Sequence, residues 1–233
     1  MHWFPAAHPT MPSWLRDAYG WSEQLVFEAP LVLPPGITLP VGTQLLDMLP
    51  ADLAAAMSRD LPAPVVAHIQ QFKPWWAMFI LMSAMGGQLA PGVEKQFLEW
   101  AGTDSKTASY LEEPETVPRL LDAVALEEFA NVFRFLVANQ DASRQHIEAA
   151  HQAWLRRDLN GMLRARAAAG LSQFVTLDRV LVDRRTLDWL PAIEALLSSA
   201  QRTLVAVGAL HLHGDHGLPA LLTAAGYSVT QLA

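Results

Sequence analysis

Four side chains that can bind metal ions lie close together near the end of the sequence. They are His211, His213, Asp215 and His216, in the stretch HLHGDH. Neutral imidazoles and carboxylates are ordinary ligands of Zn²⁺ and similar ions, and a site with an open position activates water for hydrolysis. The spacing therefore raises the question whether this stretch holds a hydrolytic metal site.

The order His-x-His-x-Asp-His resembles the signature of the metallo-β-lactamase fold, in which such side chains bind two zinc ions. That resemblance also requires a histidine, a bridging aspartate and a last histidine further along the chain. The sequence after His216 contains no His, Asp or Glu, so a dinuclear site is not expected. His213 is then expected to be solvated, and Asp215 and His216 can cap the helix predicted after them, because short polar side chains accept its first N–H groups.

The composition limits both the class of protein and its partners. The chain has 233 residues, of which 52% are hydrophobic, so it can bury a sizeable core. With 23 acidic and 16 basic residues, a formal net charge of −7, it lacks a basic stripe for phosphates, and a nucleic-acid partner is not expected. No cysteine is present, which excludes disulfides and thiolate ligands.

No segment is expected to cross a membrane. The most apolar stretch, residues 75–85, is shorter than the roughly 20 residues that span a bilayer. The first residues, MHWFPAAHPT, lack the basic and apolar regions of a signal peptide. A cytoplasmic location is therefore favoured unless a leader has been removed.

The hydrophobic pattern predicts an α/β fold whose two ends enclose a helical region. Apolar runs of strand length cover residues 2–8 and 22–30, with a loop and a short helix between them. Residues from about 43 to 170 show helical spacing, interrupted near residues 105–118 by a segment that can hold one short strand ending near Glu112. Prolines stand where helices should begin or break, at Pro50, Pro62, Pro74 and Pro118.

The last part of the chain predicts a helix, an apolar strand, a second helix and a strand over residues 227–232. The apolar strand, TLVAVGAL, is typical of the centre of a sheet that is covered on both faces. We therefore expect one domain over residues 1–233, with a parallel-rich sheet from about 1–30 and 180–233 and a helical cap from about 43–170.

Ionisable residues follow the strands that this arrangement brings together. Functional side chains of open parallel sheets lie at the carboxyl edge, where the strands end. His8, Glu28 and His211 each follow a predicted strand. Their convergence at one edge is the first indication of a site.

The sequence from Gly208 onward resembles the C-terminal motif of the TraB/GumN family, which is related to the Tiki metalloproteases. The hallmark of that family is a pair of Gly-x-x-His motifs with a glutamate between them. The second motif corresponds to residues 208–211, GALH, and the glutamate to Glu28. The first corresponds to PAAH, where Pro5 and Ala6 replace Gly-Thr; proline fixes φ and lacks an N–H, so this half of the site is expected to be reshaped.

Further segments resemble the family in the same order along the chain. They are KPWWAM at 73–78, PGVEKQFLEWA at 91–101, YLEEPETVPRLLDAV at 110–124, AWLRRDL at 153–159 and VDRRTLDWLPAIEALL at 182–197. Three positions depart from the pattern: Glu94 replaces Asp, Arg157 replaces Gly, and Arg185 replaces the Asn that follows the family's arginine, here Arg184. The resemblance implies a fold of the erythromycin-esterase/ChaN-like type.

The resemblance also implies a divalent metal ion, Mn²⁺, Co²⁺ or Zn²⁺, bound by His8, Glu28 and His211. Two imidazoles and a carboxylate leave positions for a water molecule whose pKa is lowered. Glu112 is expected as a general base or extra ligand, and Arg184 as an electrostatic clamp on a carbonyl or oxyanion. The implied activity is that of a metal-dependent hydrolase, with a peptide or small-molecule substrate.

Other interpretations of the same residues stay open. A buried Glu28 needs a partner, and an ion pair with Arg184 would supply one without a metal. Trp75 and Trp76 suit core packing of the helical cap more than a cofactor pocket. The alternative function is a non-catalytic protein that binds haem or another small molecule on this scaffold, and an exposed apolar patch on the cap would favour a homodimer.

Overall fold

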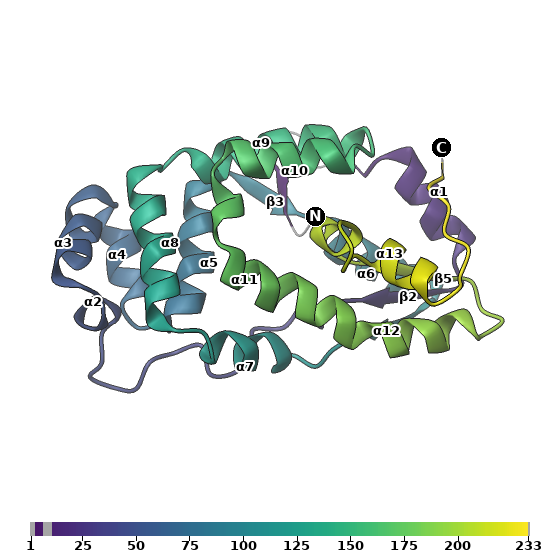
Figure 1. Cartoon of the computed structure of the whole chain (residues 1–233), viewed down its shortest axis with the longest axis horizontal. Helices are drawn as coiled ribbons and strands as arrows, with labels where there is room; N and C mark the ends of the chain where they lie inside the picture. The colour runs from purple at the N-terminus through teal and green to yellow at the C-terminus, as the bar shows by residue number, and fades with distance from the viewer. Residues whose placement is uncertain (1–2, 7–10, 233) are drawn as a thin grey trace.

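The computed structural model describes residues 3–6 and 11–232 of the chain (Figure 1). Its strands are β1 (Trp3–Pro5), β2 (Gln24–Phe27), β3 (Leu89–Pro91), β4 (Thr107–Tyr110) and β5 (Thr203–Ala206). Its α-helices are α1 (Ser13–Trp21), α2 (Leu45–Met48), α3 (Ala51–Asp60), α4 (Ala63–Ile69), α5 (Pro74–Met85), α6 (Val93–Asp104), α7 (Thr116–Asp122), α8 (Leu126–Ala138), α9 (Ala142–Leu155), α10 (Leu159–Ala168), α11 (Val175–Asp178), α12 (Arg184–Leu197) and α13 (Leu218–Ala224). Shorter turns are the 3₁₀-helices η1 (Leu171–Gln173) and η3 (Ala209–Leu212) and the π-helical η2 (Arg179–Asp183).

A parallel sheet with the strand order β4-β2-β5 positions the candidate site. Gln24 of β2 lies opposite Thr107 of β4 and Thr203 of β5. The central strand β2 buries Leu25, Val26 and Phe27, as expected for a strand covered on both faces. The prediction of an α/β fold with a parallel sheet from both ends of the chain is confirmed, and so is the short strand before Glu112.

The prediction that the strand before His8 joins this sheet is wrong. β1 pairs with β3 in a separate antiparallel sheet, where Trp3 lies opposite Pro91. Pro5 has no N–H to donate, which confines such a strand to an edge or a small sheet. The carboxyl edge of the parallel sheet therefore follows β2, β4 and β5.

Two predictions for the last part of the chain are also wrong. Among the described strands, the apolar β5 lies at the edge of the sheet and its residues are half-buried. It ends at Ala206, so that His211 lies in the turn η3. Residues 227–232 form no strand, and Val229 and Leu232 stay exposed. A strand is stabilised by burying one of its faces, and the apolar side chains Val229 and Leu232 of this segment are not buried.

Helices cover both faces of the parallel sheet. Leu25 and Phe27 pack with Tyr19 of α1 and Phe97 of α6 on one face. On the other side, α12 and α13 pack together through Trp189, Ile193 and Leu218, with Leu111 and Val207 beside them. α6 and β4 thus belong to the α/β part, although they fall within the region expected to form the helical cap.

The remaining helices form a second apolar core. Figure 1 shows α2, α3, α4, α5 and α8 gathered at the end of the molecule opposite the strands β2 and β5. The core of this region includes Trp75, Leu81 and Phe133, all essentially inaccessible to solvent, which agrees with packing as the role of Trp75. Pro50 and Pro62 precede α3 and α4, and Pro74 and Pro118 lie in the first turn of α5 and α7, as predicted. No helix in the described ranges is long and apolar enough to cross a membrane.

Arg157, which stands where the family pattern has glycine, adopts a backbone conformation that favours glycine. Its φ is +57°, in the left-handed region that favours glycine. The next residue, Asp158, accepts a hydrogen bond from the Gly161 N–H at 2.7 Å and caps α10. The turn between α9 and α10 therefore depends on Asp158 and tolerates a strained residue before it.

Candidate functional site

The ends of the parallel strands bring two carboxylates together. Glu28 directly follows β2, and Glu112 lies just beyond β4. The backbone N–H groups of Leu111 and Glu112 donate to the carbonyl oxygens of Phe27 and Glu28, at 2.9 and 3.0 Å. This pairing continues the sheet past its last regular residues, so that both glutamates reach the carboxyl edge side by side.

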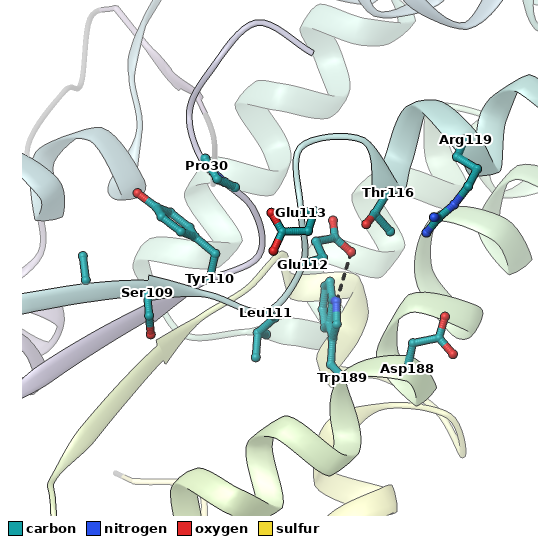
Figure 2. Close-up of a pocket in the computed structure, with 11 residues that line it drawn as sticks. Pro30, Ser109, Tyr110, Leu111, Glu112, Glu113, Thr116, Arg119, Asp188 and Trp189 are labelled. Carbon is teal, nitrogen blue, oxygen red and sulfur yellow. Dashed lines mark hydrogen bonds between the residues drawn. The ribbon is translucent and has the colours of Figure 1, made fainter. Parts of the chain in front are cut away.

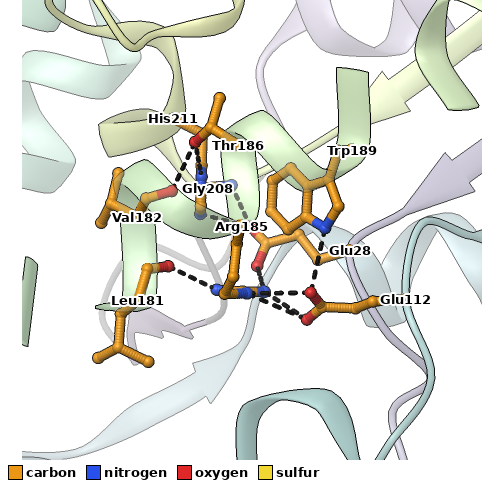
Figure 3. A network of polar contacts seen from close by, with 9 residues as sticks. All are labelled: Glu28, Glu112, Leu181, Val182, Arg185, Thr186, Trp189, Gly208 and His211. Atoms are coloured by element: carbon orange, nitrogen blue, oxygen red, sulfur yellow. Dashed lines mark hydrogen bonds and ion pairs between the residues drawn. The ribbon is translucent and has the colours of Figure 1, made fainter. Parts of the chain in front are cut away.

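Arg185 of α12 lies between these two carboxylates (Figure 3). Its Nη2 donates to Glu28 Oε2 at 2.7 Å and to Glu112 Oε1 at 2.6 Å, and its Nε lies 3.0 Å from Glu112 Oε2. The Arg185, Glu28 and Glu112 side chains are 8, 11 and 5% exposed. Burial alone would lower the pKa of Arg185, but the Glu112 hydrogen bond and the charges of both glutamates outweigh it and raise the pKa.

Arg185, and not Arg184, is the arginine that contacts Glu28. Arg184 is 66% exposed, and its Nε lies 4.0 Å from Asp188 one turn along α12. The cause is the helix face: Arg185 shares the buried face with Trp189, four residues on, while Arg184 shares the solvent face with Asp188. The ion pair considered above as the alternative to a metal therefore joins Glu28 to Arg185 instead of Arg184, and Arg184 does not reach the site.

The π-helical turn η2 supplies backbone acceptors to the same network. The Leu181 carbonyl accepts from Arg185 Nη1 at 2.9 Å, and the Val182 carbonyl accepts from the Thr186 hydroxyl at 2.7 Å. Turns of this kind occur mostly as single interruptions of α-helices, often at functional sites. Here η2 fixes the start of α12, from which Arg185 and Thr186 extend.

His211 is buried, with 4% of its surface exposed, and its ring is oriented by two neighbours. Its Nδ1 lies 2.7 Å from the Thr186 hydroxyl oxygen. That hydroxyl already donates its only proton to Val182, so it accepts from Nδ1–H, which puts the lone pair of the neutral imidazole on Nε2. The Trp189 ring packs against the His211 ring, with 4.3 Å between centroids.

His211 Nε2 lies 3.9 Å from Glu28 Oε1. The same carboxylate oxygen accepts a hydrogen bond from the N–H of Gly208, the first residue of the Gly-x-x-His motif. A Cβ at position 208 would lie 3.1 Å from Glu28 Oε1 and 3.5 Å from His211 Cδ2. The glycine thus allows the backbone to approach Glu28 closely, which explains why the Gly-x-x-His motif begins with glycine.

The donor set of Glu28 and His211 fits a divalent ion. Two donors bound at about 2.0–2.2 Å to one tetrahedral ion lie roughly 3.4 Å apart, so that a small side-chain shift from 3.9 Å brings Glu28 Oε1 and His211 Nε2 to one ion. Within the described residues no group of three His, Asp or Glu side chains is placed to hold a metal. His8, the third expected ligand, lies outside the described residues. Glu112, expected as a base or extra ligand, directs both oxygens to Arg185 and Trp189.

The structure separates His211 from the other polar residues of HLHGDH. His213 and Asp215 are exposed, and His216 Nδ1 lies 3.7 Å from Asp183 at the surface. The expected cap by Asp215 or His216 is wrong, because α13 begins after Gly217 without a side-chain cap. A Cβ on Gly217 would lie 2.7 Å from the His213 backbone, so this close approach requires glycine.

Sequence reasoning missed Arg185, Thr186 and Trp189 as members of the network. A signal for them was present, because Arg185, Trp189 and Ile193 recur at intervals of four and form one face of the predicted helix. An arginine on the apolar face of a helix implies a buried anionic partner. In the family pattern the arginine corresponds instead to its neighbour, Arg184.

The fold, the strand-end glutamates and the Gly-x-x-His turn together define an α/β protein with a polar network at the carboxyl edge of its sheet. The model of the TraB/PrgY/gumN family matches residues 1–231. The chain therefore belongs to the TraB/PrgY/gumN family. No curated protein and no solved structure gives a significant match.

Proposed function

We propose that the protein is a metal-dependent hydrolase whose divalent ion is held by Glu28 and His211, with His8 as the third ligand. The observation that carries this proposal is the orientation of His211. The contact with Thr186 orients the ring so that the lone pair on Nε2 is directed toward Glu28, and Nε2 lies 3.9 Å from Glu28 Oε1. Metal-binding histidines are usually fixed in this way through the ring nitrogen that does not bind the ion. When bound, such an ion lowers the pKa of a water molecule and makes it a nucleophile near neutral pH.

The surrounding residues position the two ligands. Arg185 holds Glu28 through Oε2, which leaves Oε1 directed toward Gly208 and His211. The Arg185 side chain donates to Glu28, Glu112 and Leu181, so we assign it a positioning role instead of the oxyanion clamp expected of Arg184. Glu112 in turn fixes Arg185 and accepts from Trp189 at 3.0 Å.

Metal analysis and thermal melts of the purified protein test this proposal. Mn²⁺, Co²⁺ or Zn²⁺ should raise the melting temperature, because a ligand that binds only the folded state stabilises it by mass action. His211→Ala should abolish the shift, and His213→Ala, which changes an exposed histidine close by in sequence, should keep it. If wild type, His211→Ala and His213→Ala all ignore the three metals, the hydrolase proposal fails.

A second candidate function is favoured by the Arg185 ion pairs. A guanidinium that already neutralises Glu28 and Glu112 forms a complete structural cluster, and the protein would then bind a ligand without catalysis. The two candidates differ in one result. Under the second, metals leave the melting temperature unchanged, while Arg185→Met still destabilises the fold strongly.

A further inference from the structure

β4 is an edge strand whose outer side faces solvent. It pairs with β2 on one side, and no strand in the described part of the chain pairs with the other side. All of its residues, Thr107, Ala108, Ser109 and Tyr110, are exposed. Proteins commonly protect such an edge with a charged side chain or a proline, because its free N–H and C=O groups can pair with another chain.

This edge lacks that protection. The strand itself carries no charge and no proline. Lys106, which precedes it, turns away from the edge, since its Nζ donates to the backbone carbonyls of Tyr19 and Ser22 at 2.5 and 2.7 Å. The outer side of β4 is therefore open to main-chain pairing.

The direction of the outward-facing groups follows from the pairing with β2. The Leu111 N–H donates to the Phe27 carbonyl at 2.9 Å, so the backbone of Leu111 faces β2. Residues alternate along a strand, which turns the N–H and C=O groups of Ser109 toward β2 and those of Ala108 and Tyr110 away from it. Ala108 and Tyr110 thus offer donor and acceptor pairs at the open edge.

A cavity of about 620 Å³ adjoins this strand and continues to the candidate site (Figure 2). Its walls include Ala108 and Tyr110 of β4, and Glu112 and Trp189 of the network. A volume of this size lies within the roughly 300–1,000 Å³ of ligand sites. Trp189 packs on His211 and Glu112 binds Arg185, so that a molecule in the cavity lies one side chain away from Glu28 and His211.

We propose that β4 and this cavity bind an extended polypeptide segment by strand addition, with the Ala108 and Tyr110 backbone as its pairing edge. Main-chain hydrogen bonds give affinity in this mode, and pockets for alternate side chains give selectivity. Around the cavity, Glu113, Asp188 and Arg119 present charges of both signs to polar side chains of such a segment. Under the proposed hydrolase function the bound segment is the substrate, and this assignment alone rests on that function.

The test uses a fluorescein-labelled heptapeptide of alternating Thr and Val between terminal lysines, together with the same peptide N-methylated at alternate amides. Fluorescence anisotropy with the whole protein measures binding, and hydrogen exchange reports the Ala108 and Tyr110 amides. We expect the first peptide to bind and to slow exchange at both amides. The N-methylated peptide, which cannot donate to the edge, should bind at least roughly tenfold more weakly.

Ala108→Pro removes one outward N–H and leaves the ladder with β2 intact, because proline is tolerated where the N–H faces solvent. It should weaken binding roughly tenfold, whereas the matched variant Ala108→Val, which keeps the N–H, should bind within about twofold of wild type. Equal binding of the two peptides, or unchanged exchange at Ala108 and Tyr110, would overturn the proposal. So would a concentration-dependent dimer in sedimentation that protects the same two amides, because a second copy would then occupy the edge.

His211→Gln separates this proposal from the proposed function. The variant should bind the Thr-Val peptide as wild type does, because His211 is not part of the edge. Peptide binding without any metal binding would support strand addition at β4 and contradict the hydrolase proposal. Metal binding that depends on His211, without peptide binding at β4, would support the metal site and overturn strand addition.

Discussion

The protein contains the same three-part arrangement twice, in different surroundings. In the helical region, the Asp122 carboxylate accepts from Lys73 Nζ at 2.6 Å and from the buried Trp75 indole at 2.8 Å. At the sheet edge, the Glu112 carboxylate accepts from Arg185 at 2.6 Å and from the buried Trp189 indole at 3.0 Å. The Lys73 and Asp122 side chains are 28 and 42% exposed, whereas those of Arg185 and Glu112 are 8 and 5% exposed.

The difference shows what burial adds to an ion pair. A partly exposed ion pair such as Lys73–Asp122 contributes about 0–1 kcal/mol to the free energy of unfolding, because water competes for both charges. A buried pair gains little overall, yet removing one partner leaves an uncompensated charge. The partly exposed pair is enough to fix the Trp75 indole. At the sheet edge, the buried charge of Arg185 also binds a second carboxylate, Glu28, and holds it close to His211.

Arg185→Met should produce the largest effect of any single change in the two arrangements. It leaves Glu28 and Glu112 buried without their cation, and we expect the free energy of unfolding to fall by about 3–5 kcal/mol in urea titrations. The matched change at the surface, Lys73→Met, should cost about 1 kcal/mol or less. Similar losses for the two variants would contradict the distinction between them.

Glu112→Gln should have the next largest effect. The amide keeps the shape of the side chain but removes its charge, so Arg185 keeps only Glu28 as an anionic partner, and we expect a loss of about 2–3 kcal/mol by urea unfolding. Asp122→Asn makes the same change beside Trp75, where solvent replaces the lost interaction, with an expected loss of about 1 kcal/mol or less. An equal loss for Asp122→Asn and Glu112→Gln would contradict the view that burial makes the Glu112 interactions the stronger ones.

Thr186→Val alters the contact between Thr186 and His211 at the sheet edge, which has no counterpart near Trp75. It removes the acceptor of His211 Nδ1–H and the donor to the Val182 carbonyl, and should cost about 1–2 kcal/mol. Under the proposed function it should also weaken metal binding about 10- to 100-fold in calorimetric titrations. Thr186→Ser keeps the hydroxyl and should restore both; failure to restore metal binding would contradict the role given to that hydroxyl.

The smallest expected effect is a pH dependence from His146 on α9, outside both arrangements. Burial first, and then the charge of Arg166, lower the pKa of His146 below its ordinary value of 6.5, against a backbone hydrogen bond at Ala165 that raises it. A histidine whose pKa is lowered on folding contributes stability that is complete above pH 6.5 and is lost as the pH falls toward and through the folded pKa. The free energy of unfolding should therefore fall below pH 6.5, by at most about 1.4 kcal/mol per pH unit from this group. His146→Gln should flatten that part of the profile; an unchanged slope would assign it to other groups.

Sequence reasoning predicted the parts of the fold that depend on local pattern. The strand β2 before Glu28 and the helical region with its proline-marked starts follow from periodicity, and the position of His211 beside Glu28 follows from the Gly-x-x-His motif. It did not predict the partner of β1, because strand pairing depends on distant residues such as those of β3. It also chose Arg184 over Arg185, since a motif gives position along the chain while burial depends on which face of α12 meets the sheet.

The visible absorption of Co²⁺ added to the purified protein tests whether Glu28 and His211 bind one divalent ion. We predict bands of bound Co²⁺ that Glu28→Gln and His211→Gln each abolish, with circular dichroism confirming that both variants fold. His213→Gln should keep the bands. Bands that survive both Glu28→Gln and His211→Gln, or their absence in the wild-type protein, would contradict the claim.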